Sequence, residues 1–117
     1  MTIDELRDRL AELCGYRKIE PQHPLSKTMW VRNGIVFVDC NSSSQDMLHP
    51  FPPNDYNALI AAWPEGWRLS VLQLMDGSWW AGGCPVGGVD VIEVDEVPTR
   101  YEAELRLTVA VLEATKT

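Results

Sequence analysis

The sequence predicts an α+β domain in which an antiparallel sheet of about four to five strands carries helices packed on its faces. Three observations lead to this fold class. Apolar residues recur at helical spacing near both ends of the chain, tight-turn dipeptides divide the middle into short β-rich runs, and capping residues precede each helical stretch. A length of 117 residues fits one domain that covers residues 1–117.

The first helix is predicted at the start of the chain. Thr2 and Glu5 have the spacing of a capping box, in which two side chains satisfy exposed amides of the first turn. Gly15 provides the left-handed residue with which many helices end. Between these signals, apolar side chains fall on one helical face: Ile3, Leu6, Leu10 and Leu13.

A β-hairpin is predicted next. The segments Met29–Val31 and Ile35–Cys40 flank the dipeptide Asn33-Gly34, and Asn-Gly is a strong signal for a two-residue turn. The preceding residues 16–28 contain two prolines and are expected to be irregular.

The second half of the chain begins with a short helix. Asn54 or Asp55 can cap it, and the helix continues to Trp63. Pro64 ends it, because a proline disfavours helical geometry in the residue before it.

A second hairpin follows, in which Asp76-Gly77 joins the strands Arg68–Met75 and Ser78–Ala81. Apolar residues alternate onto both faces of these strands, so we expect other elements to cover the hairpin on both sides. Gly82–Gly88 is predicted to be a loose loop, and Val89–Val94 a third strand that changes face or contains a bulge.

The last helix is predicted to begin after Pro98, where Thr99 forms a capping box with Glu102. Its apolar side chains recur at helical spacing and are expected to face the core: Tyr101, Leu105, Val109 and Leu112.

The formal net charge of the chain is −7. Because binding to nucleic acid depends on clustered Lys and Arg, this balance argues against direct contact with it. Two interpretations of the charge remain: it keeps the protein soluble, or an acidic face competes for a basic, nucleic-acid-binding surface of another protein. The chain has no signal-peptide pattern and no apolar run of ~18–20 residues, so we expect no membrane contact and a location in the cytoplasm.

The residue pattern contains no catalytic set. His23 and His49 lack partners at metal-ligand spacing, and Ser42–Ser44 lack the context of a nucleophilic serine. The three cysteines are far apart and are expected to be reduced thiols. We therefore expect a protein that is not an enzyme and that uses no metal and no cofactor.

Aromatic and basic residues are the remaining candidates for binding. Trp79 and Trp80 are adjacent on a predicted strand and must point to opposite faces, so one of them belongs to the core. The other either lies beneath a helix or offers its ring to a ligand or a partner. Guanidinium groups near such a ring are suited to nucleotide phosphates, and the chain supplies Arg32, Arg68, Arg100 and Arg106.

The sequence limits how these groups combine. Arg100 and Arg106 are six residues apart and lie on opposite sides of the last helix, so only an oligomer brings copies of them to one phosphate. Gly82–Gly88 is either a flexible connection or an anion-binding nest. The acidic residues at the end of the third strand are either solvated or an acidic face for a basic partner: Glu93, Asp95 and Glu96.

Several local motifs are similar to those of the phage ABA sandwich domain family. They are a proline-rich segment from Pro50, a capped helix that ends Ala61-Ala62-Trp63, Gly66-Trp67 at the start of a strand, Gly77-Ser78-Trp79-Trp80 in the next, and a closing helix led by Pro98-Thr99. The N-terminal helix also fits, so the resemblance covers most of the chain. Pro64 and the polar residues 41–45 depart from the family pattern.

The resemblance implies a phage or prophage accessory protein whose antiparallel sheet lies between helical layers, and it transfers no catalytic residue. On this basis we expect stoichiometric binding to a host defence protein through the acidic surface, as anti-CRISPR proteins do. One alternative is a sponge that holds a nucleotide second messenger between protomers, and another is a structural accessory domain with no defence role. A homo-oligomer is compatible with each hypothesis.

Overall fold

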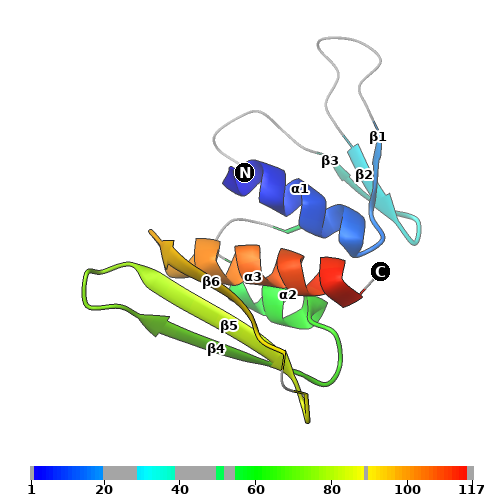
Figure 1. Cartoon of the computed structure of the whole chain (residues 1–117). Coiled ribbons are helices and arrows are strands. Elements are labelled where there is room, and N and C mark those ends of the chain that lie inside the picture. The colour runs from blue at the N-terminus through cyan, green and yellow to red at the C-terminus, as the bar shows by residue number, and fades with distance from the viewer. Residues whose placement is uncertain (1, 20–28, 39–49, 52–54, 89, 116–117) are drawn as a thin grey trace.

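The computed structural model describes residues 2–19, 29–38, 50–51, 55–88 and 90–115, which form an α+β fold. The described chain contains two three-stranded antiparallel sheets, ordered β1-β2-β3 and β4-β5-β6, in place of the predicted single sheet of four to five strands (Figure 1). Both predicted hairpins form, but they do not pair with each other. The elements are α1 (Ile3–Leu13), β1 (Arg17–Ile19), β2 (Met29–Arg32), β3 (Ile35–Val38), α2 (Tyr56–Ala62), β4 (Trp67–Gln73), β5 (Trp79–Pro85), β6 (Ile92–Val97) and α3 (Arg100–Thr115).

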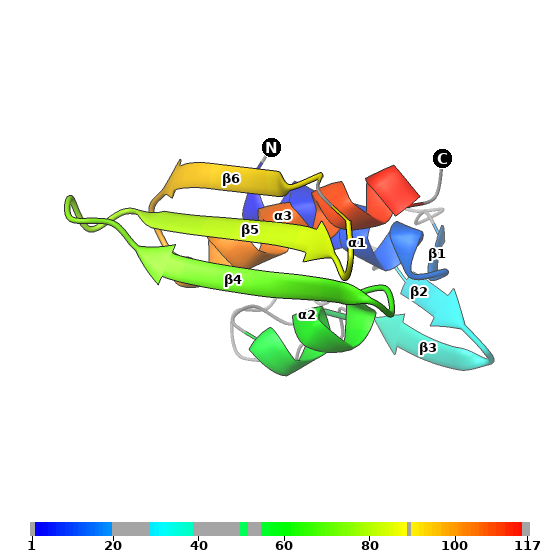
Figure 2. The same cartoon turned by 60° about the horizontal axis from the view of Figure 1, so that its bottom comes forward.

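Helix α3 occupies the centre of the fold. It packs on α1 and α2 with one side and on the sheet β4-β5-β6 with another (Figures 1 and 2). Two stripes of apolar side chains make this possible, because residues four apart in a helix lie on the same face. Nine of its sixteen residues are buried.

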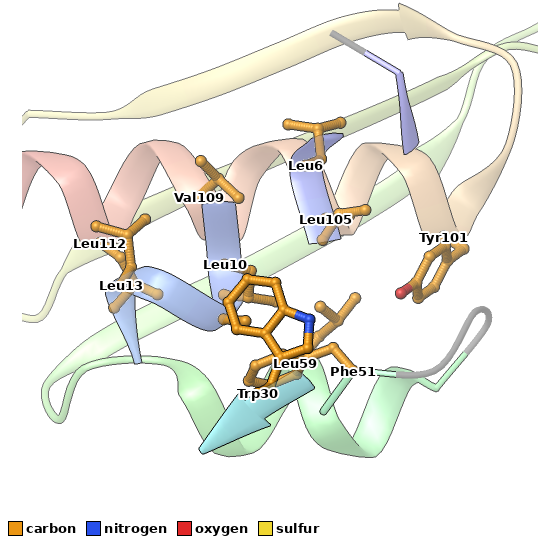
Figure 3. Close-up of a cluster of buried hydrophobic side chains, with 11 residues drawn as sticks. Leu6, Leu10, Leu13, Trp30, Phe51, Leu59, Tyr101, Leu105, Val109 and Leu112 are labelled. Carbon is orange, nitrogen blue, oxygen red and sulfur yellow. The ribbon is translucent and has the colours of Figure 1, made fainter. Parts of the chain in front are cut away.

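The first core lies between α1, α2 and α3, where Trp30 and Phe51 close it (Figure 3). The predicted face of the last helix is confirmed here, since Tyr101, Leu105, Val109 and Leu112 all belong to this core. From α1 it receives Leu6, Leu10, Ala11 and Leu13.

The second core lies between α3 and the inner face of the sheet β4-β5-β6. Helix α3 supplies Ala103, Leu107 and Val111, a stripe that the sequence interpretation overlooked. From the sheet come Ala81 and Val97, with partly buried Trp67, Leu69, Val71, Trp79, Ile92 and Val94 packed around them.

Local signals in the sequence place most element boundaries correctly. The amide of Glu5 donates to Oγ1 of Thr2 at 3.2 Å, and the amide of Glu102 donates to Oγ1 of Thr99 at 3.2 Å. Asp55 caps α2 by accepting from the amide of Ala58 at 3.1 Å. Asn33 has a positive φ of 53°, as the predicted two-residue turn between β2 and β3 requires.

Three predicted segments differ from the structure. Arg17–Ile19 forms the strand β1, although residues 16–28 were expected to be irregular. Residues 20–28 and 39–49, which include Cys40 of the first predicted hairpin, lie outside the described chain. The loose loop predicted for Gly82–Gly88 is wrong, because β5 continues to Pro85 and only a short turn follows it. The third strand begins at Ile92, later than predicted, and ends at Val97.

The outer face of the sheet β4-β5-β6 is open, which corrects the expectation that helices cover both faces. Its residues Arg68, Ser70, Leu72 and Glu93 are exposed, and no described helix lies over them (Figure 2). No helix in the described chain is both long and apolar enough to cross a membrane.

Candidate functional site

An acidic hollow forms where β6 leads into α3. The hollow has a volume of about 450 Å³, and β6 is an edge strand that pairs with β5. Its lining residues are Val94, Asp95, Glu96, Val97, Pro98, Glu102 and Arg106.

A bulge in β6 brings Asp95 and Glu96 into this hollow together. The pairing of Ala81 with Val94 shifts at the bulge to that of Trp79 with Val97, so β6 contributes one more residue than β5. Successive residues of a regular strand point to opposite faces, and the extra residue breaks that alternation. Glu96 takes up the change with a positive φ of 55°, which is uncommon for a residue with a side chain of this kind.

The charge of the hollow is negative. Arg106 donates from Nε to Oε2 of Glu102 at 3.1 Å, and this pair within α3 neutralises one carboxylate. Asp95 and Glu96 are exposed and form no ion pair with any described residue. The two carboxylates are therefore available to a basic group from outside.

Glu93, the third member of the predicted acidic cluster, lies elsewhere. It pairs across the sheet with Gly82 and accepts a hydrogen bond from Nε1 of Trp80 at 3.0 Å. This contact belongs to the open outer face of the sheet. The structure thus separates Glu93 from the hollow that holds Asp95 and Glu96.

Trp79 and Trp80 point to opposite faces, as predicted. Trp79 packs against the second core, and Trp80 lies on the outer face over Gly82. A Cβ atom on Gly82 would come within 2.5 Å of Cη2 of Trp80, so the indole rests directly on the backbone of the strand. This close approach explains why a glycine occupies the middle of β5.

The four predicted phosphate-binding arginines are dispersed. Arg100 donates to Glu104 at 3.1 Å and lies over the ring of Tyr56, and Arg106 pairs with Glu102 as described. Arg32 lies over the ring of Tyr16, with 5.2 Å from Cζ to the ring centroid.

Arg68 is exposed on the outer face and pairs across the sheet with Cys84, whereas Trp80 pairs with Leu72. The two residues are thus four positions apart along the hairpin. Within one protomer, none of the described contacts brings two of the arginines to one ring.

No group of three or more His, Cys, Asp or Glu side chains in the described ranges has the geometry to hold a metal ion. His23 and His49 lie outside these ranges.

Glu102 is the residue of the hollow that the sequence interpretation missed as a site residue. The sequence interpretation assigned Glu102 to helix capping alone. In the structure its amide donates to Thr99 as part of the cap, whereas its carboxylate binds Arg106. Its position three residues after Thr99, in a helix that directly follows the acidic strand, is the signal that would have placed it there.

Comparison of the chain with models of protein families, with curated proteins and with solved structures gave no match. The resemblance to the phage ABA sandwich domain family remains a prediction.

Proposed function

We propose that this protein acts by stoichiometric binding, and that it docks the acidic hollow between β6 and α3 onto a basic surface of a partner protein. The observation that carries the proposal is the bulge at Glu96. It turns two consecutive carboxylates toward one hollow at the edge of a sheet.

The backbone of Glu96 supports a role beyond folding. A left-handed conformation costs a residue with a Cβ atom about 1–2 kcal/mol, whereas Gly and Asn adopt it readily. A glutamate at this position therefore retains its carboxylate at the expense of stability, which is typical of residues at binding sites.

The electrostatics of the hollow favour a basic protein surface. Asp95 and Glu96 are exposed and have no cationic partner in the described chain, so a Lys or Arg of a partner gains an ion pair without breaking one. Charge complementarity of this kind raises the rate of association and selects among partners. The overall charge of −7 also favours association with a basic partner.

The second part of the proposal concerns the identity of the partner. The resemblance to the phage ABA sandwich domain family supports a host defence protein in the cytoplasm, bound at the surface with which it holds nucleic acid. The nucleotide-sponge alternative has less support, because the arginines on which it depends contact carboxylates and rings at separate places.

A pair of matched double variants tests the proposal. D95N/E96N removes both available carboxylates of the hollow, and D4N/E12Q removes two exposed carboxylates of α1, so both variants have the same net charge. Each protein is tagged, incubated with host lysate and washed at increasing salt, and bound proteins are identified by mass spectrometry. We expect a partner that is retained by the wild type and by D4N/E12Q, and is lost with D95N/E96N.

The captured partner then permits a direct measurement. We expect its affinity for the wild type to fall steeply with salt, because exposed charges are screened over about 8 Å at physiological ionic strength. A duplex oligonucleotide should displace the protein if the two share a basic surface. Equal binding by both double variants would contradict the acidic hollow as the docking site, and turnover of a substrate by the purified protein would contradict stoichiometric binding.

A further inference from the structure

The end of α2 meets the start of β4 at the edge of the sheet opposite to β6 (Figure 2). A second hollow, of about 430 Å³, lies there. Its volume is within the usual range of small-molecule sites. The hollow is lined by Ile60, Trp63, Pro64, Glu65, Gly66, Trp67 and Leu69.

The indole of Trp63 is held rigidly at this hollow. Its Nε1 donates to Oγ1 of Thr108 at 2.9 Å, and its six-membered ring lies against the backbone of β5. A Cβ atom on Gly83 would come within 2.7 Å of Cη2 of Trp63, so the strand has a glycine where the ring touches it. The ring is therefore in place before any ligand arrives, which lowers the entropic cost of binding.

The turn between α2 and β4 positions the second indole. Pro64 follows the end of the helix, and Gly66 has a positive φ of 86° that reverses the chain direction. The carbonyl oxygen of Gly66 accepts from the amide of Val86, which ties the turn to the end of β5. These contacts bring Trp67 to the hollow only four residues after Trp63.

The charge of the lining residues is the third observation. Glu65 is the sole ionisable side chain among them; it is exposed and no described residue forms an ion pair with it. A site with two indoles, aliphatic walls and one carboxylate is complementary to a positively charged group that carries alkyl substituents. Such a cation is attracted by the faces of tryptophan rings and loses little hydration when it enters.

We propose that this hollow binds a small organic cation of the quaternary ammonium class, with its methyl groups against Trp63 and Trp67 and its charge beside Glu65. This site is separate from the acidic hollow at β6, and the proposal does not depend on the function proposed above.

Three probes test the chemistry of recognition. Choline chloride, its neutral carbon isostere 3,3-dimethyl-1-butanol and ammonium chloride are titrated at constant ionic strength into ¹⁵N-labelled protein, and the indole Nε1–H resonances are followed by NMR. We expect choline to shift the resonances of Trp63 and Trp67 with saturation in the millimolar range, and to leave those of Trp30 and Trp80 in place. We expect about tenfold weaker binding of the neutral isostere and no saturable shift with ammonium.

Two variants and a control locate the site. E65Q is expected to weaken choline binding by about threefold to tenfold, and W67A to abolish it. E12Q removes an exposed carboxylate on α1 and should bind choline as the wild type does. If circular dichroism shows that W67A is unfolded, E65Q alone tests the proposal, because it changes an exposed side chain outside both cores.

The following results would overturn the proposal: no saturable shift with choline, equal binding of choline and its neutral isostere, or equal losses in E65Q and E12Q. The D95N/E96N variant separates the two sites. It should retain choline binding, so that failure of one proposal is not read as failure of the other.

Discussion

Nε1 of Trp63 and Oγ1 of Thr108 are 2.9 Å apart and join the end of α2 to the middle of α3. Thr108 is fully buried, and its hydroxyl donates in turn to the carbonyl oxygen of Glu104 at 2.7 Å. The hydroxyl therefore satisfies both a side chain and a backbone group in a place with little access to water. This double contact explains why a threonine occupies a fully buried position of the helix.

Thr108→Val should destabilise the protein. Valine has the shape of threonine but leaves the indole N–H without its acceptor, and an unsatisfied buried donor costs about 1–3 kcal/mol. Thr108→Ser keeps the hydroxyl and should lose less. Urea denaturation followed by circular dichroism measures both free energies of unfolding, and equal losses in the two variants would contradict the importance of the hydrogen bond.

Gly82 and Gly83 should respond differently to substitution by alanine. At Gly83 the new Cβ would lie 2.7 Å from Trp63 and 3.4 Å from Val111, within packed structure, and overpacking of this kind costs about 1–3 kcal/mol. At Gly82 the three atoms nearest to the new Cβ all belong to the side chain of Trp80, which lies on the open face and can rotate toward solvent.

Gly82→Ala should therefore cost less than about 1 kcal/mol. It should also break the contact of Trp80 with Glu93, which moves the indole N–H resonance of Trp80 in an NMR spectrum. Thermal unfolding of Gly82→Ala and Gly83→Ala measures the loss of stability in each variant. A larger loss in Gly82→Ala would show that the outer face is more rigid than its exposure indicates.

Glu96→Asn should stabilise the free protein while it weakens binding to a basic partner. Asparagine adopts the left-handed conformation more readily than glutamate, and we expect a gain of about 0.5–1 kcal/mol in the free energy of unfolding. Because the variant is more stable, its loss of binding cannot arise from unfolding. Chemical denaturation gives the first quantity and titration calorimetry with the captured partner the second; a variant that is both destabilised and fully active in binding would refute the assignment.

The stability of the protein should depend on Tyr101 at alkaline pH. Burial raises the pKa of the Tyr101 phenol above its ordinary value of 10.0, with a smaller opposing effect from Arg7. In the unfolded chain the phenol ionises near the ordinary value, while the folded protein retains the proton. The stabilisation is therefore complete below the unfolded pKa and is lost as the pH rises through it toward the folded pKa.

Tyr101→Phe removes this dependence. Urea midpoints measured between about pH 9 and pH 11 should fall more steeply for the wild type than for Tyr101→Phe. Tyr56→Phe serves as the control, because it leaves the Tyr101 phenol in place. Parallel curves for the wild type and Tyr101→Phe would contradict a role for this group.

The sequence predicts the elements of this fold better than their assembly. Capping at Thr2, Asp55 and Thr99 and the Asn33 turn depend on hydrogen bonds between residues close in the chain, and all are found. Whether two hairpins join into one sheet depends on packing between distant segments. That choice leaves no local signal, and the single predicted sheet is for this reason wrong.

The same limit applies to the sites. Gly82 and Gly83 resemble loop residues in sequence, because glycine is rare in strands unless another group approaches the backbone closely. The approaching groups are Trp80 on one face and Trp63 on the other, and only the tertiary structure brings the second one near. Ala103, Leu107 and Val111 of α3 have a spacing of four, so this second stripe was detectable and was overlooked.

The position of α3 has a consequence for biosynthesis. Both cores need side chains of this helix, and it follows the other described helices and strands along the chain. A nascent polypeptide that has not yet reached Leu112 has no way to close either core, and its apolar surfaces stay open to chaperones or to aggregation while translation proceeds. Yield in cells should thus depend on how soon α3 packs against the helices and strands that precede it.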